Sequence, residues 1–243
     1  MWLKITRNYS PNFDLPKRSK NKIKFIIIHY TGMKSETLAL KRLCDPKKKV
    51  SSHYFIKKNG DILELVPDLY RAWHAGKSNW KNYHSLNDYS IGIEIQNSGH
   101  DYSYENFSLN QISSLKKILR YLVKKYRINV ENILGHSDIA PDRKKDPGEK
   151  FPWKNLSQIK LAKWHEIKEK KLKKLRLIRL SSKEENELLK NLFKIGYYNQ
   201  KSLILKSKKK MLFKTFQRRF RQSLVNGISD KECLLISKNL LKS

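Results

Sequence analysis

Cysteine is scarce in this chain of 243 residues. The two cysteines, Cys44 and Cys233, lie far apart in the sequence, so they provide neither a disulfide framework nor a cysteine zinc site. Long apolar runs are also absent, and none reaches the ~20 residues that a membrane-spanning helix requires. Residues 1–7 lack the apolar core of a signal peptide. We therefore expect two buried thiols, no membrane span and no visible export signal.

Acidic residues are few as well. The chain has 22 Asp and Glu against 53 Lys and Arg, which gives a formal net charge of +31. A polyanionic partner would explain this charge, namely nucleic acid, an anionic membrane or an acidic cell-wall polymer. A lysine-biased proteome whose excess charge coats the surface would explain it equally well. Because no nucleic-acid-binding motif is recognisable, we do not expect nucleic acid as the main partner.

Apolar periodicity predicts a core in the first part of the chain. Residues 1–22 are polar and are expected to form an irregular arm. Residues 23–29 form a continuous β-branched run, which is typical of a strand buried on both faces. Two further short strands around an Asn-Gly pair predict a hairpin at 50–66. Another strand, at 90–96, alternates so that three isoleucines face one side and Glu94 faces the other.

Helices and a loop complete this part. Residues 35–43 are expected to be helical, and a capping-box pattern at Ser108 begins a helix that should end near Tyr126. A short strand is expected at 130–134. Residues 70–88 show little periodicity and predict a long loop, and long loops within compact domains are usually functional.

The last third of the chain has a helical period. Residues 156–177 are basic with few apolar positions, which predicts a helical linker. Three short helices are then expected, the first capped by Ser182 with Glu185 and ended by Gly196, and the others near 208–221 and 230–241. Three helices within about 60 residues favour a small bundle with its own core.

One stretch, residues 135–148, carries the most chemistry. It combines the potential metal ligands His136 and Asp146 with two lysines and two prolines, and the strand ending in His29 supplies a third ligand. Two histidines and one carboxylate are a common catalytic zinc set, because three protein ligands leave a fourth position for water. Pro147 favours an extended backbone at Asp146, which suits a ligand loop. Taken singly, each histidine is more often an ordinary polar residue.

Six motifs in series resemble the zinc-dependent N-acetylmuramoyl-L-alanine amidases, which share their fold with the peptidoglycan recognition proteins. The resemblance covers about residues 23–156, in the right order and spacing. The motifs are Ile28-His29-Tyr30-Thr31, Ser52-His53-Tyr54, Ala72-Trp73-His74-Ala75-Gly76, Asn87-Asp88-Tyr89-Ser90-Ile91-Gly92-Ile93-Glu94, Gly135-His136-Ser137-Asp138-Ile139-Ala140-Pro141 and Arg143-Lys144-Lys145-Asp146-Pro147-Gly148.

The resemblance implies an α/β fold with a mixed central β-sheet flanked by helices. It places one zinc ion on His29, His136 and Asp146, the catalytic glutamate on Glu94 and the catalytic lysine on Lys144. The implied substrate is peptidoglycan or a muropeptide, cleaved at the amide between N-acetylmuramic acid, or its 1,6-anhydro form, and L-alanine of the stem peptide. The alternative is a non-catalytic peptidoglycan-binding protein of the same fold, in which we would expect a metal ligand to be lost.

Five further residues are expected to line the groove, by stacking on sugar or binding peptide carboxylates. They are His53, Trp73, His74, Trp80 and Asn87. The alternative reading places the two tryptophans in the core or in a lid, and gives His53 a structural role.

The C-terminal bundle resembles, more faintly, the three-helix peptidoglycan-binding domain appended to some of these amidases. The phenylalanine-glutamine-arginine pattern within 213–221 carries this likeness, although the usual glycine- and proline-rich turns are thinned out. A structural bundle with a basic face is the alternative. We expect an arm at 1–22, a zinc amidase domain at 23–156, a basic helical linker at 157–181 and this domain at 182–243.

Two features of the chain point to different compartments. A wall-binding-like domain favours the cell envelope or periplasm. The lack of a visible signal peptide favours a cytoplasmic role on soluble anhydro-muropeptides.

Overall fold

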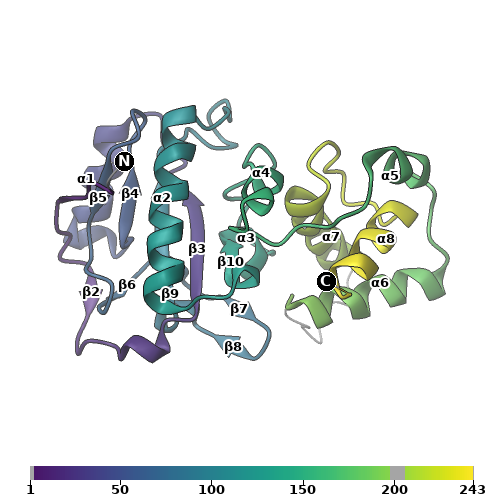
Figure 1. Ribbon diagram of the computed structural model, residues 1–243, viewed down its shortest axis with the longest axis horizontal. Coiled ribbons are helices and arrows are strands. Elements are labelled where there is room, and N and C mark those ends of the chain that lie inside the picture. Colours follow the sequence, from purple (N-terminus) through teal and green to yellow (C-terminus); the bar gives the residue numbers. More distant parts are fainter. Residues whose placement is uncertain (1–2, 198–205, 243) are drawn as a thin grey trace.

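A six-stranded mixed sheet forms the centre of the first half of the protein. The computed structural model describes residues 3–197 and 206–242 (Figure 1). The strand order is β1-β5-β4-β9-β3-β10, and every neighbouring pair is parallel except β4 with β5. The strands are β1 Thr6–Arg7, β5 Ile62–Glu64, β4 Tyr54–Ile56, β9 Ser90–Ile95, β3 Phe25–Tyr30 and β10 Ile133–Gly135. The predicted α/β class with a mixed sheet is confirmed.

The two faces of the sheet bury different clusters. On one face, Ile26 and Ile28 of β3 pack with the alternate isoleucines of β9 and with α2 (Leu109–Tyr126). On the other face, Phe25 and Ile27 pack against the C-terminal helices. Because side chains alternate along a strand, the residues that follow Ile27 on this second face, including His29, are directed toward the site described below.

Two predicted helices and the predicted hairpin are confirmed. Helix α1 (Glu36–Cys44) begins after Ser35, whose side chain accepts a hydrogen bond from the Leu38 amide. Helix α2 begins with the predicted capping box between Ser108 and Gln111. Strands β4 and β5 pair antiparallel around the Asn-Gly turn, and α1 packs on the face that carries Phe55 and Leu63.

Short elements occupy segments expected to be irregular. In the predicted loop at 70–88, β7 (Asn79–Trp80) pairs with β8 (Tyr83–His84), and a 3-10 turn, η3, covers Leu86–Asp88. Strand β6 (Arg71–Ala72) pairs with β2 (Phe13–Asp14) from the predicted arm. The arm also holds β1 and η1 (Lys20–Lys22), so its irregular assignment is wrong. Two-residue strands leave no periodicity in the sequence, which is why they were not predicted.

The predicted helical linker is also interrupted. Helix α4 (Trp153–Gln158) ends before Lys160, which has a left-handed φ of 56°. The following Leu161 and Ala162 are buried in the first cluster, so the chain turns to dock on the core. Helix α5 (Glu169–Leu175) begins only afterwards. The strand expected at 130–134 likewise begins later, as β10, because η4 (Val130–Asn132) is a 3-10 turn.

Three longer helices complete the molecule, as predicted. They are α6 (Ser182–Ile195), α7 (Lys206–Phe220) and α8 (Lys231–Leu240). The capping box of α6 lies one residue earlier than predicted, on Ser181 and Glu184. Residues 198–205, between α6 and α7, lie outside the described residues. None of the described helices has the length and apolar character needed to cross a membrane.

The expectation of a separate bundle core is wrong for the described residues. Leu188, Phe216 and Ile236 of the bundle belong to one buried cluster with Phe25 and Ile27 of β3. Figure 1 shows α5–α8 gathered beyond α3 (His136–Ile139) and β10, at the opposite end of the molecule from α1. The bundle is therefore built onto the sheet at the edge where the 135–148 stretch begins.

Candidate active site

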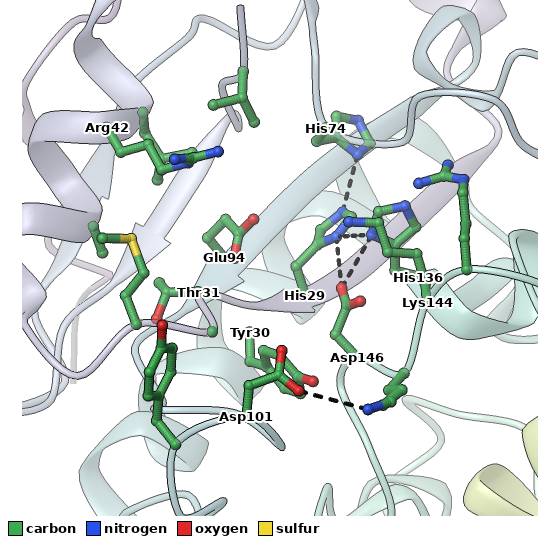
Figure 2. Close-up of a pocket in the computed structure, with 18 residues that line it drawn as sticks. His29, Tyr30, Thr31, Arg42, His74, Glu94, Asp101, His136, Lys144 and Asp146 are labelled. Atoms are coloured by element: carbon green, nitrogen blue, oxygen red, sulfur yellow. Dashed lines mark hydrogen bonds and ion pairs between the residues drawn. The ribbon is translucent and has the colours of Figure 1, made fainter. Parts of the chain in front are cut away.

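Three side chains from two distant parts of the chain converge at the carboxyl ends of β3 and β10 (Figure 2). These strands run parallel, and the register that pairs Gly135 with Ile28 brings His136 beside His29. Asp146 reaches both from the loop after α3. The Nδ1 atoms of His29 and His136 lie 2.9 Å apart, and each lies 3.1 Å from Oδ2 of Asp146. All three side chains are buried.

The donor atoms of this triad fit a tetrahedral zinc ion. Ligand atoms at bond lengths of about 2.0 Å lie about 3.3 Å apart in a tetrahedron, close to the separations observed. Burial, together with the nearby His136 ring, lowers the pKa of His29 to about 4. Burial alone would raise the pKa of Asp146, but the two imidazoles hold it far below its usual range. At neutral pH His29 is therefore neutral and Asp146 ionised, the forms that bind metal.

The loop carrying Asp146 is held close to β10. A Cβ added at Gly135 would lie 2.6 Å from Cδ of Pro147, so only glycine lets the loop fold back so closely. The backbone amide of Ser137 donates to the carbonyl of Asp146 at 2.8 Å. The Asp138 carboxylate accepts from the Gly135 amide at 2.8 Å. These contacts fix the two ligands of this stretch relative to each other.

Glu94 stands next to the triad because β9 and β3 are paired in register. His29 is opposite Glu94 on the neighbouring strand, and both side chains leave the same face of the sheet. The Oε2 atom of Glu94 is buried and has no hydrogen-bond partner among the described residues. Burial, followed by the nearby Asp146 carboxylate, raises the pKa of Glu94 to about 8, against the opposing effect of Lys144. Glu94 is therefore poised to exchange a proton near neutral pH.

An open cavity of about 690 Å³ joins the triad, Glu94 and Lys144. Its walls are rich in cations. Arg42 extends from α1, on the far side of Glu94 from His136 and Lys144 in Figure 2. The cavity is lined by His29, Tyr30, Thr31, Gly32, Met33, Ala39, Arg42, Leu43, Val50, His74, Glu94, Asp101, Tyr102, His136, Arg143, Lys144, Lys145 and Asp146.

Of the five residues expected to line the groove, only His74 does so. Its Nδ1 lies 3.1 Å from Nε2 of His29. Burial, and then the neighbouring His29 ring, hold the pKa of His74 well below its ordinary value, so the ring is neutral. A Cβ at Gly92 would lie 2.4 Å from the His74 ring, so this glycine provides the space in which the ring lies against the sheet.

The other four expected groove residues lie outside the cavity lining. Trp80 is 3% exposed and packs edge-on against Tyr197, which corrects its assignment to the groove. His53 is fully buried, where its ring accepts a hydrogen bond from the Gly92 amide and lies 3.0 Å from Arg18. Both side chains are therefore structural.

Trp73 and Asn87 are also engaged elsewhere. The Trp73 indole donates to Asp14 at 2.9 Å. The Asn87 side-chain oxygen accepts from the amides of His74 and Ala75, at 3.1 and 2.7 Å. Asn87 therefore shapes the backbone behind the site and does not face the cavity.

Several cavity residues were missed by the sequence reading. Arg42 gave no signal, because on an isolated helix it is one cation among many. Asp101 lies in an irregular segment and forms an ion pair with Lys145 at 3.6 Å. Tyr30 lies within the first of the six motifs, and the resemblance assigns it no role. Its hydroxyl lies 2.9 Å from Nδ1 of His100. Proximity to His29 in the sequence was the available signal for Tyr30.

Comparison with known proteins agrees with this arrangement. The family model described as N-acetylmuramoyl-L-alanine amidase matches residues 19–149. The N-acetylmuramoyl-L-alanine amidase AmiD of Escherichia coli K12 is 34% identical over 233 residues, which cover 91% of this chain and 83% of that protein.

Two solved structures have the same fold over almost the whole chain. One is the E. coli AmiD complex with anhydro-N-acetylmuramic acid-L-Ala-D-gamma-Glu-L-Lys, with TM-score 0.81, 32% identity and coverage of 94% and 92% of the two chains. The other is AmpDh3 from Pseudomonas aeruginosa in complex with an anhydromuramic pentapeptide, with TM-score 0.80, 28% identity and coverage of 96% of each chain. The chain belongs to the N-acetylmuramoyl-L-alanine amidase family.

Proposed function

We propose that this protein hydrolyses the amide between N-acetylmuramic acid, or its 1,6-anhydro form, and L-alanine of a peptidoglycan stem peptide. The observation that carries the proposal is the convergence of His29, His136 and Asp146 in an open cavity beside Glu94, whose buried Oε2 has no hydrogen-bond partner among the described residues. Family membership supports the reaction. The AmiD and AmpDh3 structures are complexes with anhydromuramyl peptides, which supports the anhydro form as a substrate.

We infer that one zinc ion binds to Nδ1 of His29, Nδ1 of His136 and Oδ2 of Asp146. The short separations of these atoms and the protonation states of His29 and Asp146 support this ligand set. Zinc, when bound, supplies a Lewis acid that polarises a carbonyl and makes a water molecule acidic enough to act as a nucleophile at neutral pH. The cavity gives the substrate amide access to this position.

Glu94 is the proton carrier in this proposal. Its carboxylate would accept a proton from the attacking water and then donate it to the nitrogen of the leaving L-alanine, so that the amine departs neutral. Without metal its pKa is about 8, and a bound cation would favour the ionised carboxylate that accepts the first proton. Removing such a group typically costs about 10²–10⁴-fold in rate.

The cationic side chains that line the cavity favour binding of the rest of the substrate. The Lys144 ammonium would stabilise the negative charge that develops on the carbonyl oxygen during attack. Arg42, Arg143 and Lys145 line the same cavity, with Asp101 as an opposing charge. A stem peptide carries free carboxylates, so an excess of cations around it favours its binding.

The proposal is tested by incubating the protein with purified anhydro-muropeptides and following the release of free stem peptide by mass spectrometry. We expect release by the parent protein, loss of release on chelation and recovery when zinc is added. His136→Ala should be inactive under all three conditions. Release that persists through both chelation and His136→Ala would refute the proposal.

A further inference from the structure

His74 lies between the metal triad and the protein interior. Its ring is 6% exposed and meets the His29 ring edge-on, with 5.1 Å between ring centroids. Its two nitrogens have different neighbours. Nδ1 lies 3.1 Å from Nε2 of His29, and Nε2 lies 3.2 Å from the hydroxyl of Ser90. The His74 ring therefore links a proposed metal ligand to a fixed point on β9.

The hydrogen bonds around His74 can run in only one direction when His29 binds metal through Nδ1. The Nε2 of His29 must then carry the proton and donate to Nδ1 of His74. A neutral His74 must carry its own proton on Nε2, which donates to Ser90. The Ser90 hydroxyl in turn donates to the Leu86 carbonyl at 2.5 Å. Every donor has an acceptor, so the chain of bonds selects a single tautomer for each ring.

The adjacent residue orients the second imidazole ligand. The Nε2 of His136 lies 3.1 Å from the carbonyl oxygen of Ala75, which accepts its proton and leaves Nδ1 free to bind metal. The amides of His74 and Ala75 both donate to the side-chain oxygen of Asn87. Two consecutive residues, clamped by Asn87, therefore orient both proposed histidine ligands.

We propose that His74 is a positioning residue for the metal centre, which fixes the tautomer and ring orientation of His29 through its Nδ1 acceptor. The inference rests on the proposed function, because it concerns how the chain prepares the same metal site. It assigns His74 a role through His29 and not through contact with the substrate. Loss of such a partner behind a metal ligand typically weakens metal binding by about 10–100-fold.

Two variants of similar size distinguish the loss of the hydrogen-bond acceptor of His74 from the loss of the rest of its ring. His74→Leu removes the acceptor, whereas His74→Asn has the same shape as leucine but keeps an oxygen where Nδ1 stands. Zinc affinity is measured by competition with a chromophoric chelator, on metal-free proteins shown by circular dichroism to be folded. We expect His74→Leu to bind zinc about 10–100-fold more weakly than the parent. His74→Asn should recover most of this loss.

Two spectroscopic readouts complete the test. The visible spectrum of the cobalt-substituted protein should change in His74→Leu and resemble the parent in His74→Asn. Long-range proton–nitrogen NMR of the zinc-loaded parent should find His74 protonated on Nε2, a result that needs no variant to fold. Protonation on Nδ1, or equal zinc affinity in the parent and His74→Leu, would overturn the role. Equal weakening by both variants would also overturn it.

Failure of the wider proposal looks different. A parent protein that binds no zinc contradicts both the proposed function and the role of His74. A parent that binds zinc and cleaves muropeptide, while His74→Leu binds zinc equally well, contradicts only the role of His74.

Discussion

The surroundings of Glu94 disfavour an ionised carboxylate, unlike those of a surface residue. Among the described residues, no group forms a hydrogen bond with its buried Oε2, and Asp146 adds a second negative charge nearby. With a pKa of about 8, Glu94 is largely protonated at pH 7 in the metal-free protein. A cation bound to the neighbouring triad would favour the ionised carboxylate. Metal binding should therefore release the Glu94 proton.

This coupling gives a prediction that needs no substrate. At pH 7, calorimetric titration with zinc in buffers of different ionisation enthalpy should show the parent releasing up to one proton more than Glu94→Gln. Well above pH 8 the difference should disappear, because Glu94 is then already ionised before zinc binds. Equal proton release by the two proteins at pH 7 would show that Glu94 does not sense the metal.

Residue roles were predictable where a motif surrounded them, and less so where only residue type was available. The sequence motifs led to His29, His136 and Asp146, which the structure brings together. The binding role given to Trp80 failed because aromatic side chains serve cores and grooves equally well. A tryptophan in a segment without periodicity gives no sign of which use it has.

At the scale of elements, the site depends on how closely the 136–148 loop approaches β10. Gly135 has an ordinary φ of −85°, so alanine there adds no backbone strain and tests crowding alone. Gly135→Ala should push against Pro147, costing about 1–3 kcal/mol of unfolding free energy. It should also weaken zinc binding, because Asp146 immediately precedes this proline. Chemical denaturation and chelator competition measure the two effects.

Stability and zinc affinity of Gly135→Ala together show whether crowding at β10 also moves Asp146. Loss of stability together with unchanged zinc affinity would mean that the loop carrying Asp146 adapts without moving its ligand, contrary to the close fit described here. Loss of both is the expected result.

Elements with a strong local pattern were predictable, and elements defined by distant pairing were not. Helix α2 has a capping box and regularly spaced apolar residues, and β3 has a continuous apolar run. Strand β6 exists only because Arg71 and Ala72 pair with β2, more than 50 residues earlier in the chain. Such short strands are products of the tertiary fold, so their sequences carry no periodic signal.

At the scale of the whole molecule, the C-terminal bundle is joined to the loop of the candidate site. Arg219 of α7 donates to the Asp138 carboxylate at 2.6 Å and to the Ile133 carbonyl at 3.0 Å. The Tyr197 hydroxyl donates to the other Asp138 oxygen at 2.9 Å. The guanidinium also lies over the Trp153 ring, 4.2 Å from its centroid. The bundle thus neutralises a buried carboxylate two residues after His136.

Removing one partner of this buried pair should be costly. Arg219→Met leaves the Asp138 charge unpaired and should lower the unfolding free energy by about 3–5 kcal/mol. The double variant Arg219→Met/Asp138→Asn should be more stable than Arg219→Met, because the uncompensated charge is gone. Lys210→Met, which changes an exposed cation on the same helix, is the control and should have little effect. Urea denaturation of the parent, the single variants Arg219→Met and Asp138→Asn, the double variant and the control measures the coupling. An Arg219→Met protein as stable as the control would contradict the structural role of this contact.

The prediction that the bundle has a separate core was wrong, because the sequence does not show which surface each helix packs against. Leu188 and Leu192 of α6, like Leu212 and Phe216 of α7, stand four residues apart. This spacing shows that each helix has an apolar face but not which partner covers it. In the structure these faces meet β3 and β10 as well as each other. The peptidoglycan-binding role suggested by the sequence for this domain stays a prediction.

The central claim is that His29, His136 and Asp146 bind one zinc ion. The most direct test is a crystal of the zinc-loaded protein measured on both sides of the zinc absorption edge. The account predicts one anomalous peak per chain, about 2.0–2.2 Å from Nδ1 of His29, Nδ1 of His136 and Oδ2 of Asp146. A zinc-loaded crystal with no peak at these three atoms, or with its peak at other residues, would contradict it.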